Sequence, residues 1–529
     1  MSFFDILRRP EYVAVMTDAG VQVLQQHGDA FSSGGIAVSF SVLSDRVTVS
    51  LTSPNEAIRH VRMRWHGDIP GHIRVLGDHW ERGYGDLEWR GIVPERPLPW
   101  YFLTSDGDAT HGYGVETGGA SIAFWQADTA GVALTLDVRN GSKGVQLGAR
   151  TLTAAHIRTR RGASGESAFA SASALCKMLC SSPRLPSHPI YGGNDWYYAY
   201  GQNSHQGILG DADRISELSP CTSNRPYMII DGGWSPNESN AGPWDIGNAR
   251  FPDMPGLASQ IAAKGVRPGI WFRPLTTTSD APASLLLKPR PIGPPIVLDP
   301  TVPEVLQLIE TDVRRFRQWG YELIKYDFST FDIFGYWGST MGAGLTQGDW
   351  TFANRSITTA EAIRGLYRAI ADAAGDAVLI GCNTIGHLGA GLFDLQRTGD
   401  DTSGRVWERT RKMGINSLAF RMPQHEAFYL ADADCVGLTT AIPWSLNRQW
   451  LDLLARSGTP LFVSLSPDAL GAEQAAALKD AFHSAASPQP PAEPLDWLDT
   501  TCPASWRLGN ATVHFDWSEP GGASPYFHS

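Results

Sequence analysis

The sequence has few cysteines, no excess of positive charge and no long apolar segment. Its 6 cysteines are scattered over 529 residues, without a CxxC pair or histidines at the spacing of a zinc site. The formal net charge is −11, which argues against nucleic acid or an anionic membrane as a partner, because both attract basic surfaces. No window reaches the roughly 18 apolar residues of a membrane-spanning helix.

Signals for export and for cofactors are also missing. The segment MSFFDILRRPEYVAVM has no long apolar run after its basic residues, so no signal peptide is expected and a cytoplasmic location is the default. No GxGxxG or GxxxxGK[ST] motif opens a predicted helix, and no histidine cluster suggests a metal. We therefore expect neither cofactor nor metal, while the sequence leaves a homo-oligomer open.

The two ends of the chain are predicted to be β-structure. Residues 1–185 contain short alternating segments such as GIAVSFSVL and GVALTLDVR, separated by Gly, Asp, Asn and Ser, which is typical of a β-sandwich domain. The Pro-rich segment SPQPPAEP then begins a region, residues 488–529, in which SWRLGNATVHFDWS predicts a small C-terminal β element.

Between these regions, residues 186–487 alternate strand-like and amphipathic helical segments. Strands are expected at 189–196, 226–234, 267–275, 321–328, 377–384, 392–401, 427–437 and 460–467. Eight strand–helix units over roughly 300 residues match a (β/α)8 (TIM) barrel. An open doubly wound sheet is the alternative. The predicted fold class is thus α/β, a (β/α)8 barrel with an N-terminal β-sandwich domain and a small C-terminal β domain.

Acids and aromatic residues stand where the predicted strands end, which is the face of a barrel that carries active sites. Lys325 and Asp327 lie two apart and so share one face of a strand. One acid at a strand end often only caps the next helix, but a whole ring of such residues is hard to assign to capping. In chain order they are Asp195, Trp196, Asp231, Trp234, Trp271, Arg273, Lys325, Asp327, Cys382, Asn383, Arg397, Asp400, Asp401, Asp432 and Asp434.

Two carboxylates without a metal can hydrolyse a glycoside, and 18 tryptophans would suit the apolar faces of sugars. Asp327 is the candidate nucleophile, because the Lys325 ammonium favours its ionised form. Asp401 or Asp400 is the candidate acid/base, since the neighbouring negative charge could raise its pKa. The alternative for Lys325 and Asp327 is a buried ion pair that holds the barrel mouth, which would add little net stability.

The motifs IKYDF, RTGDDT, GIWFRPL, IDGGW and LADADC together resemble those of the α-galactosidases of glycoside hydrolase family 36 and its clan. The resemblance implies the same three-part fold and a retaining, exo-acting α-glycosidase that acts on an oligosaccharide or glycoside. It implies Asp327 as nucleophile, Lys325 as sugar-binding lysine and Asp401 as acid/base, with Asp400 as second choice. Arg397 should contact the hydroxyl beside the anomeric carbon.

The resemblance also implies a set of residues around the sugar. They are Trp196, Trp271, Cys382, Asp231 and, more loosely, Trp80 in GDHWERGYGDLEWRG. Asp434 and Cys435 match a motif that is structural more often than catalytic.

One departure affects specificity, because relatives carry Asp-Asp where this chain has Asp231 and Gly232. Those acids hold O4 and O6 of galactose, so we expect weaker galactose selection and another sugar in the pocket. The loop after the fourth strand could supply replacement contacts through Trp337 and Trp350. Two alternatives remain, a transglycosylase that uses the same residues and a non-catalytic carbohydrate-binding barrel.

Overall fold

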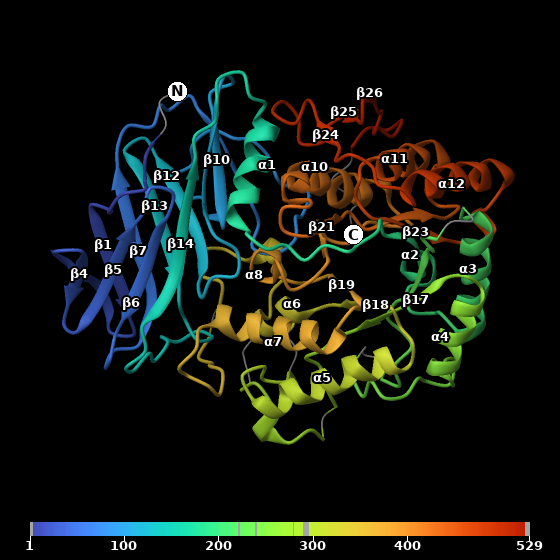
Figure 1. The fold of residues 1–529 in the computed structure, drawn as a ribbon, viewed down its shortest axis with the longest axis horizontal. Coiled ribbons are helices and arrows are strands. Elements are labelled where there is room, and N and C mark those ends of the chain that lie inside the picture. Colours follow the sequence, from blue (N-terminus) through green and yellow to red (C-terminus); the bar gives the residue numbers. More distant parts are fainter. Residues whose placement is uncertain are drawn as a thin grey trace.

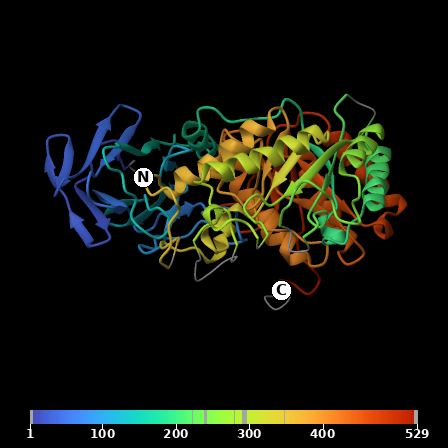
Figure 2. The same ribbon diagram turned by 90° about the horizontal axis from the view of Figure 1, so that it is seen from below.

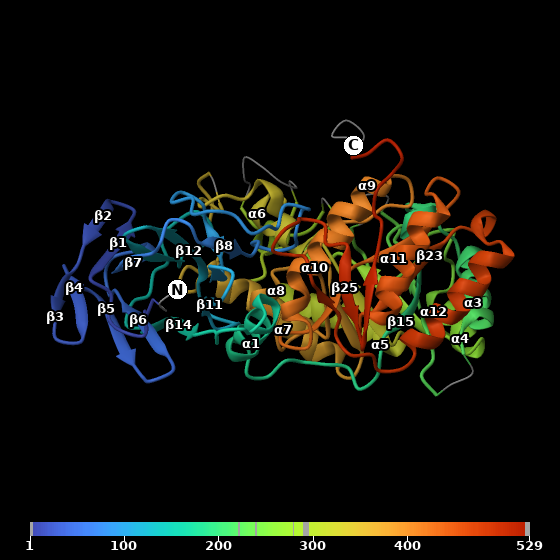
Figure 3. The same cartoon turned by 90° about the horizontal axis from the view of Figure 1, so that it is seen from above.

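The computed structural model describes residues 4–220, 223–237, 241–278, 280–288, 296–346 and 348–523. Antiparallel sheets from the first third of the chain lie at one end of the longest axis, and a parallel sheet surrounded by helices lies at the other (Figures 1, 2 and 3). The protein is thus a mixed α/β molecule built from antiparallel sheets and one large parallel sheet.

Two antiparallel sheets form the N-terminal end. The first contains, in spatial order, β2 (Gly20–Val23), β1 (Tyr12–Thr17), β7 (Ile58–His66), β13 (Gly131–Asp137), β12 (Ile122–Asp128) and β9 (Leu98–Pro99). The second contains β3 (Gln25–His27), β4 (Ala30–Ser33), β5 (Ile36–Val42), β6 (Val47–Thr52), β14 (Leu152–Arg160), β11 (Thr110–Val115), β10 (Tyr101–Ser105) and β8 (Arg74–Gly77). Phe102 of β10 packs on Trp125 of β12 at 5.6 Å between ring centroids, so the sheets face each other across an apolar core.

The parallel sheet has the order β21-β20-β19-β18-β17-β16-β15-β23-β22. Its strands are β15 (Tyr191–Asn194), β16 (Tyr227–Ile230), β17 (Arg267–Phe272), β18 (Leu323–Tyr326), β19 (Val378–Gly381), β20 (Leu395–Arg397), β21 (Leu430–Asp432), β22 (Cys435–Leu438) and β23 (Leu461–Leu465). Every one of these pairings is parallel. Each expected strand of this region is therefore present.

The two edge strands of the sheet, β21 and β22, follow each other in the chain with only Ala433 and Asp434 between them. Asp434 has a φ of 72°, which is costly for a residue with a side chain and turns the strand. The first half pairs with β20 and the second with β23. The seventh expected strand is thus two segments, and the two edges of the sheet are joined through two residues.

Helices follow the strands and cover the sheet, as Figure 1 shows for α5 and α7 on one side and α11 and α12 on another. The larger ones are α3 (His205–Leu218), α4 (Met254–Ala263), α5 (Pro303–Gln318), α7 (Thr359–Ala374), α11 (Trp444–Arg456) and α12 (Ala472–Ala485). Thr358 and Glu361 form a complete capping box at the start of α7, which satisfies N–H groups that the first turn leaves free. All residues of β16 and β18 are buried, as expected for strands covered on both faces.

The helix expected after the sixth strand is interrupted. It consists of α9 (Trp407–Arg409), the π-helical turn η3 (Thr410–Asn416) and α10 (Ser417–Arg421). Such turns often mark functional sites, because the extra residue re-aims the neighbouring side chains. Here η3 and α10 contact residues 78–87, a loop that extends from the N-terminal sheets.

Smaller elements complete the chain. Helix α1 (Ala168–Leu179) packs on β11, and β24 (Glu493–Pro494), β25 (Ser505–Leu508) and β26 (Ala511–His514) form a three-stranded antiparallel sheet. In the part of the chain that the structure describes, no helix combines the length and the hydropathy needed to cross a membrane.

Candidate active site

Asp327 lies directly after β18, and its carboxylate is held by three donors. Oδ2 accepts a hydrogen bond from the Trp271 indole N–H at 3.1 Å, and Oδ1 accepts from the backbone N–H groups of Phe328 at 2.6 Å and Asn383 at 3.1 Å. Phe328 has a φ of 64°, which bends the chain as the strand ends. The carboxylate is therefore fixed by neighbours from β17 and β19 while the residue stays partly exposed.

Lys325 forms its ion pair with Asp231, which lies at the end of β16, and not with Asp327. The distance from Lys325 Nζ to Asp231 Oδ2 is 2.7 Å, and both side chains are less than a tenth exposed. Burial lowers the pKa of the ammonium, but the charge of Asp231 outweighs it and raises that pKa well above its usual value. The alternative of a Lys325–Asp327 pair is thus wrong, because the second strand supplies the counter-ion.

Asp231 is itself held by two residues at the end of β15. Its Oδ2 accepts from the Asn194 amide at 2.7 Å, and its backbone N–H donates to Asp195 Oδ1 at 2.7 Å. Burial, and then the charge of Asp231, raise the pKa of Asp195 to about 8. Asp195 stands at the N-cap of α2 (Trp196–Ala199), but its side chain makes no capping hydrogen bond. Its carboxyl group supports the Lys325–Asp231 pair and does not cap this helix.

Arg397, the last residue of β20, connects the remaining parts of the site. Its guanidinium lies 2.8 Å from Asp434 Oδ2 and 3.2 Å from Asp401 Oδ1, and it donates to the Cys382 sulfur at 3.4 Å. Asp434 also accepts from the backbone N–H and the hydroxyl of Thr402 at 2.8 and 2.9 Å. The turn inside the seventh strand therefore places a counter-ion behind Arg397, in line with a structural role for Asp434.

Asp400 and Asp401 follow β20 at the rim of the site, with side chains that are 24% and 39% exposed. Burial raises the pKa of Asp401, but Arg397, then Arg82 and Lys325, outweigh it and lower that pKa below its usual range. The expectation that a neighbouring carboxylate raises the pKa of Asp401 is thus wrong, because the charges of Arg397 and then Arg82 and Lys325 determine the direction of the shift. Asp400 contacts Arg82 and Arg409.

The loop that contains Trp80, which the resemblance placed loosely at the site, reaches the site from the N-terminal sheets. This inserted loop, residues 78–87, is fixed by an ion pair of Asp78 with Arg421 at 2.9 Å and by hydrogen bonds between Leu87 and Asn416 at 2.9 and 3.3 Å. Gly83 N donates to Thr398 O at 2.8 Å, and Asp400 N donates to Gly83 O at 2.9 Å. The loop thus extends the end of β20.

Three side chains of this loop, those of Glu81, Arg82 and Tyr84, belong to the site. Glu81 accepts hydrogen bonds from the Tyr84 hydroxyl and the Asn383 amide, and Arg82 lies 3.0 Å from Asp400 Oδ1. The usable signal in the sequence was a glycine, since a Cβ at Gly83 would lie 2.6 Å from Ser417 Oγ. Only glycine allows this close approach of two chain segments.

The other residues expected at the site are placed as follows. Trp196 packs on Tyr200 at 5.8 Å and is partly exposed. Trp80 packs on Trp100 and Phe124 at 6.1 and 5.7 Å within the N-terminal sheets. The two residues after Trp80, and not its ring, approach the acids.

The two tryptophans of the loop after the fourth strand lie in different surroundings. Trp337 stacks on Phe331 at 4.4 Å and lies 5.7 Å from the Arg82 guanidinium. Trp350 is buried against Phe352, and its backbone pairs with Ser142. The expectation that Trp350 supplies a sugar contact is wrong, because this residue anchors the loop to the N-terminal sheets.

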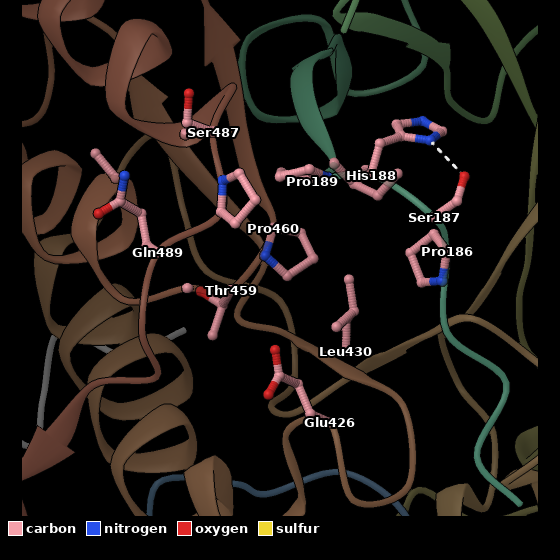
Figure 4. Close-up of a pocket in the computed structure, with 15 residues that line it drawn as sticks. Pro186, Ser187, His188, Pro189, Glu426, Leu430, Thr459, Pro460, Ser487 and Gln489 are labelled. Carbon is pink, nitrogen blue, oxygen red and sulfur yellow. Dashed lines mark hydrogen bonds between the residues drawn. The ribbon is translucent and has the colours of Figure 1, made fainter. Parts of the chain in front are cut away.

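Two further observations concern metal binding and a cavity elsewhere on the parallel sheet. Within the described ranges, no group of three or more His, Cys, Asp or Glu side chains could hold a metal ion. A cavity of about 190 Å³, lined by Pro189, Glu426, Leu430 and Pro460 (Figure 4), lies where β15, β21 and β23 begin. It is therefore at the opposite ends of the strands from the acids.

We expect replacement of Lys325 by methionine to destabilise the protein by about 3–5 kcal/mol, because Asp231 then becomes a buried charge without its cation. The measurement is urea unfolding followed by tryptophan fluorescence. The double variant Lys325→Met, Asp231→Asn should recover part of the loss, since it removes both charges. Equal stability of the single variant and the wild type would contradict the pairing.

No family model matches the sequence, and no curated protein matches it. Solved structures do match. The alpha-galactosidase of Thermus thermophilus, in complex with p-nitrophenyl alpha-D-galactopyranoside, is 18% identical, with a TM-score of 0.61 over 95% of this chain and 99% of that one. A variant GH36 alpha-galactosidase of Geobacillus stearothermophilus, in complex with 1-deoxygalactonojirimycin, is 13% identical, with a TM-score of 0.61 over 90% and 75%.

A GH31 family sulfoquinovosidase from E. rectale is also similar, at 12% identity and a TM-score of 0.58 over 98% of this chain and 88% of that one. Identities this low carry information about backbone arrangement and not about which bond is cleaved. The chain therefore shares its fold with structurally characterised glycoside hydrolases, among them family 36 alpha-galactosidases.

Proposed function

We propose that the protein is a retaining, exo-acting α-glycosidase related to the family 36 α-galactosidases. The observation that carries the proposal is that two neighbouring residues after β19 connect the two candidate acids, one by a direct contact and the other through Arg397. Asn383 N donates to Asp327 at 3.1 Å, while the Cys382 sulfur accepts from Arg397, which contacts Asp401 at 3.2 Å. Two carboxylates held over one set of strand ends fit glycoside hydrolysis.

The same proposal includes a more specific fold. The joined edges of the parallel sheet support a closed (β/α)8 barrel with eight staves, in which β21 and β22 form the seventh. We assign residues 186–487 to this barrel, 1–185 to a β-sandwich domain and 488–529 to a small C-terminal β domain. We retain the cytoplasmic location expected from the sequence as part of the proposal, and a homo-oligomer stays open.

In the proposed mechanism the first step forms a bond between Asp327 and the anomeric carbon. The bond to the leaving oxygen breaks, and Asp401 donates the proton that this oxygen needs. Trp271 and the two backbone N–H groups keep the carboxylate of Asp327 oriented for attack. Asp401 then takes a proton from water, which cleaves the glycosyl–Asp327 ester.

Lys325 and Arg397 have their counter-ions in Asp231 and Asp434, and both are assigned to holding sugar hydroxyls. A neutral pair of this kind can donate to a substrate without an uncompensated charge in the site. Trp196, partly exposed beside Tyr200, is assigned to packing on the sugar face. Asp400 stays the second choice for the acid/base.

The proposal is tested with a panel of nitrophenyl α- and β-glycosides, followed by NMR of the first-formed sugar. We expect cleavage of α-glycosides only, with the α-anomer released first, since two inversions restore the configuration. Because Gly232 offers no carboxylate, we expect galactoside not to be the single preferred substrate. Efficient cleavage of galactoside alone would show that Gly232 does not set specificity. Release of the β-anomer first would contradict the retaining mechanism.

A further inference from the structure

A buried guanidinium from the inserted loop lies beside the proposed acid/base. The Arg82 side chain is 3% exposed, with Nη2 at 3.0 Å from Asp400 Oδ1 and Nη1 at 3.8 Å from Asp401 Oδ1. Its guanidinium carbon lies 5.7 and 6.0 Å from the ring centres of Trp337 and Tyr84. These contacts fix one positive charge at the edge of the site where the leaving oxygen is protonated.

The guanidinium group of Arg82 has an N–H donor that lacks a hydrogen-bond acceptor. Among the described residues, none accepts a hydrogen bond from the buried Nε atom of Arg82, and Nη2 has only its ion-pair contact with Asp400. The adjacent carboxylate of Glu81 is 3.8 Å from Nε, but it already accepts from Tyr84, Asn383 and the backbone of Gly338. A buried donor without an acceptor is destabilising, and a bound acceptor would remove that cost.

Arg82, Arg397 and Arg409 face the carboxylates of Asp400, Asp401 and Asp434, and Glu81 lies 3.8 Å from Arg82 Nε. Ionised Asp401 supplies one of the negative charges at this edge. General acid catalysis requires the protonated form of Asp401. Protonation then removes a negative charge that faces both Arg397 and Arg82. Among the described residues, the Nε atoms of both guanidinium groups lack an acceptor, while Arg397 keeps Asp434 at 2.8 Å and Arg82 keeps Asp400 at 3.0 Å.

We propose that the substrate is a glycoside bearing an anionic group, a carboxylate or a sulfate, which Arg82 binds next to the scissile bond. The planar guanidinium matches the geometry of such oxyanions. The proposal rests on the α-glycosidase function and adds the class of substrate. The anion belongs either to the terminal sugar or to the leaving group, and the experiment separates the two.

An anion bound to Arg82 would also favour the protonated form of Asp401, which the first step requires. The surrounding cations, Arg397 and then Arg82 and Lys325, lower the pKa of Asp401 despite its burial. A negative group on Arg82 would offset one of these charges and raise the pKa of the carboxyl group as the substrate binds.

The test compares matched substrates. In one arm the α-galacturonide and α-glucuronide of p-nitrophenol are set against the neutral galactoside and glucoside. In the other arm 4-carboxyphenyl α-galactoside is set against 4-carbamoylphenyl α-galactoside. The wild type is expected to favour the anionic member of one arm in kcat/KM. Arg82→Met should lower kcat/KM for that member by about 100-fold, as loss of one partner of a buried charge pair does, and the neutral member far less.

Two variants serve as controls. Arg82→Lys keeps the charge but not the planar fork, and should retain part of the preference. Arg409→Met removes a different cation from Asp400, one whose Nε and Nη2 already donate to Asp401 O and Asp400 Oδ2 at 3.1 Å each. This variant should lower kcat/KM for the anionic and the neutral member of each pair by the same factor.

The inference is overturned if the wild type shows no preference in either arm, or if Arg82→Met lowers both members of every pair by the same factor. If no glycoside is cleaved, titration calorimetry with the anionic and neutral members of both arms decides, and equal binding of both members in each arm by the wild type overturns it. Cleavage of neutral α-glycosides without a preference overturns this inference alone. Arg82-dependent binding of the anion without any cleavage overturns the proposed function alone.

Discussion

Replacing Asp327 by asparagine is expected to lower kcat/KM for the best α-glycoside by roughly 10⁴–10⁶-fold, the scale on which the loss of a catalytic nucleophile acts. A carboxamide does not form the ester that the first step requires. The amide oxygen can still accept from Phe328 N and Asn383 N, whereas its NH₂ group would face the Trp271 N–H. The measurement is the initial rate of nitrophenol release at saturating and limiting substrate.

Two controls separate chemistry from folding. The variant Trp271→Phe removes the indole donor to Asp327 but leaves the carboxylate. Its kcat/KM should therefore fall far less than that of Asp327→Asn. For Asp327→Ala, added azide should restore turnover and give the β-glycosyl azide, since a single displacement inverts the configuration. Wild-type rates for a folded Asp327→Asn protein would refute the nucleophile assignment.

Replacing Asp401 by alanine is expected to reduce kcat by about 10²–10⁴-fold, the usual contribution of general acid–base catalysis. The loss should be largest for disaccharides and smaller for nitrophenyl glycosides, because nitrophenolate leaves without a proton. Azide should accelerate the second step and yield the α-glycosyl azide, since it attacks the glycosyl–Asp327 ester and inverts it once more. Rates and the product anomer, read by NMR, check both expectations.

Asp400→Ala is the matched variant for this experiment. Its carboxylate lies between Arg82 and Arg409, at 3.0 and 3.1 Å, and its removal should reduce the rate without any azide rescue. Rescue of Asp400→Ala but not of Asp401→Ala would transfer the acid/base role to Asp400. The pair of variants thus resolves the alternative that the sequence left open.

Local sequence patterns were sufficient to predict most of the fold. The strands from Tyr191 to Leu465 are short apolar runs between amphipathic segments, and burial on both faces of a parallel sheet produces that pattern directly. The antiparallel sheets at the N-terminus follow from alternating segments such as β6, whose buried and partly exposed residues alternate. The break at Asp434 was not visible, because a single left-handed residue leaves no periodic signal.

The partners within the site depended on tertiary structure. The sequence places Lys325 two residues from Asp327, but Lys325 pairs with Asp231, 94 residues earlier. Neighbouring strands of a sheet lie closer in space than the spacing along one chain suggests, so proximity in sequence selected the wrong counter-ion. The same reason hid Arg82, whose charge, after that of Arg397, lowers the pKa of Asp401 despite the burial of this carboxyl group.

The order of residue types along the chain thus determined which elements form and which carboxylates end the strands, because burial and hydrogen bonding act locally on each segment. Which charges meet was decided only when the strands paired side by side and residues 78–87 packed against the end of β20. Electrostatic interactions depend on distance through space, and that distance is a property of the folded chain.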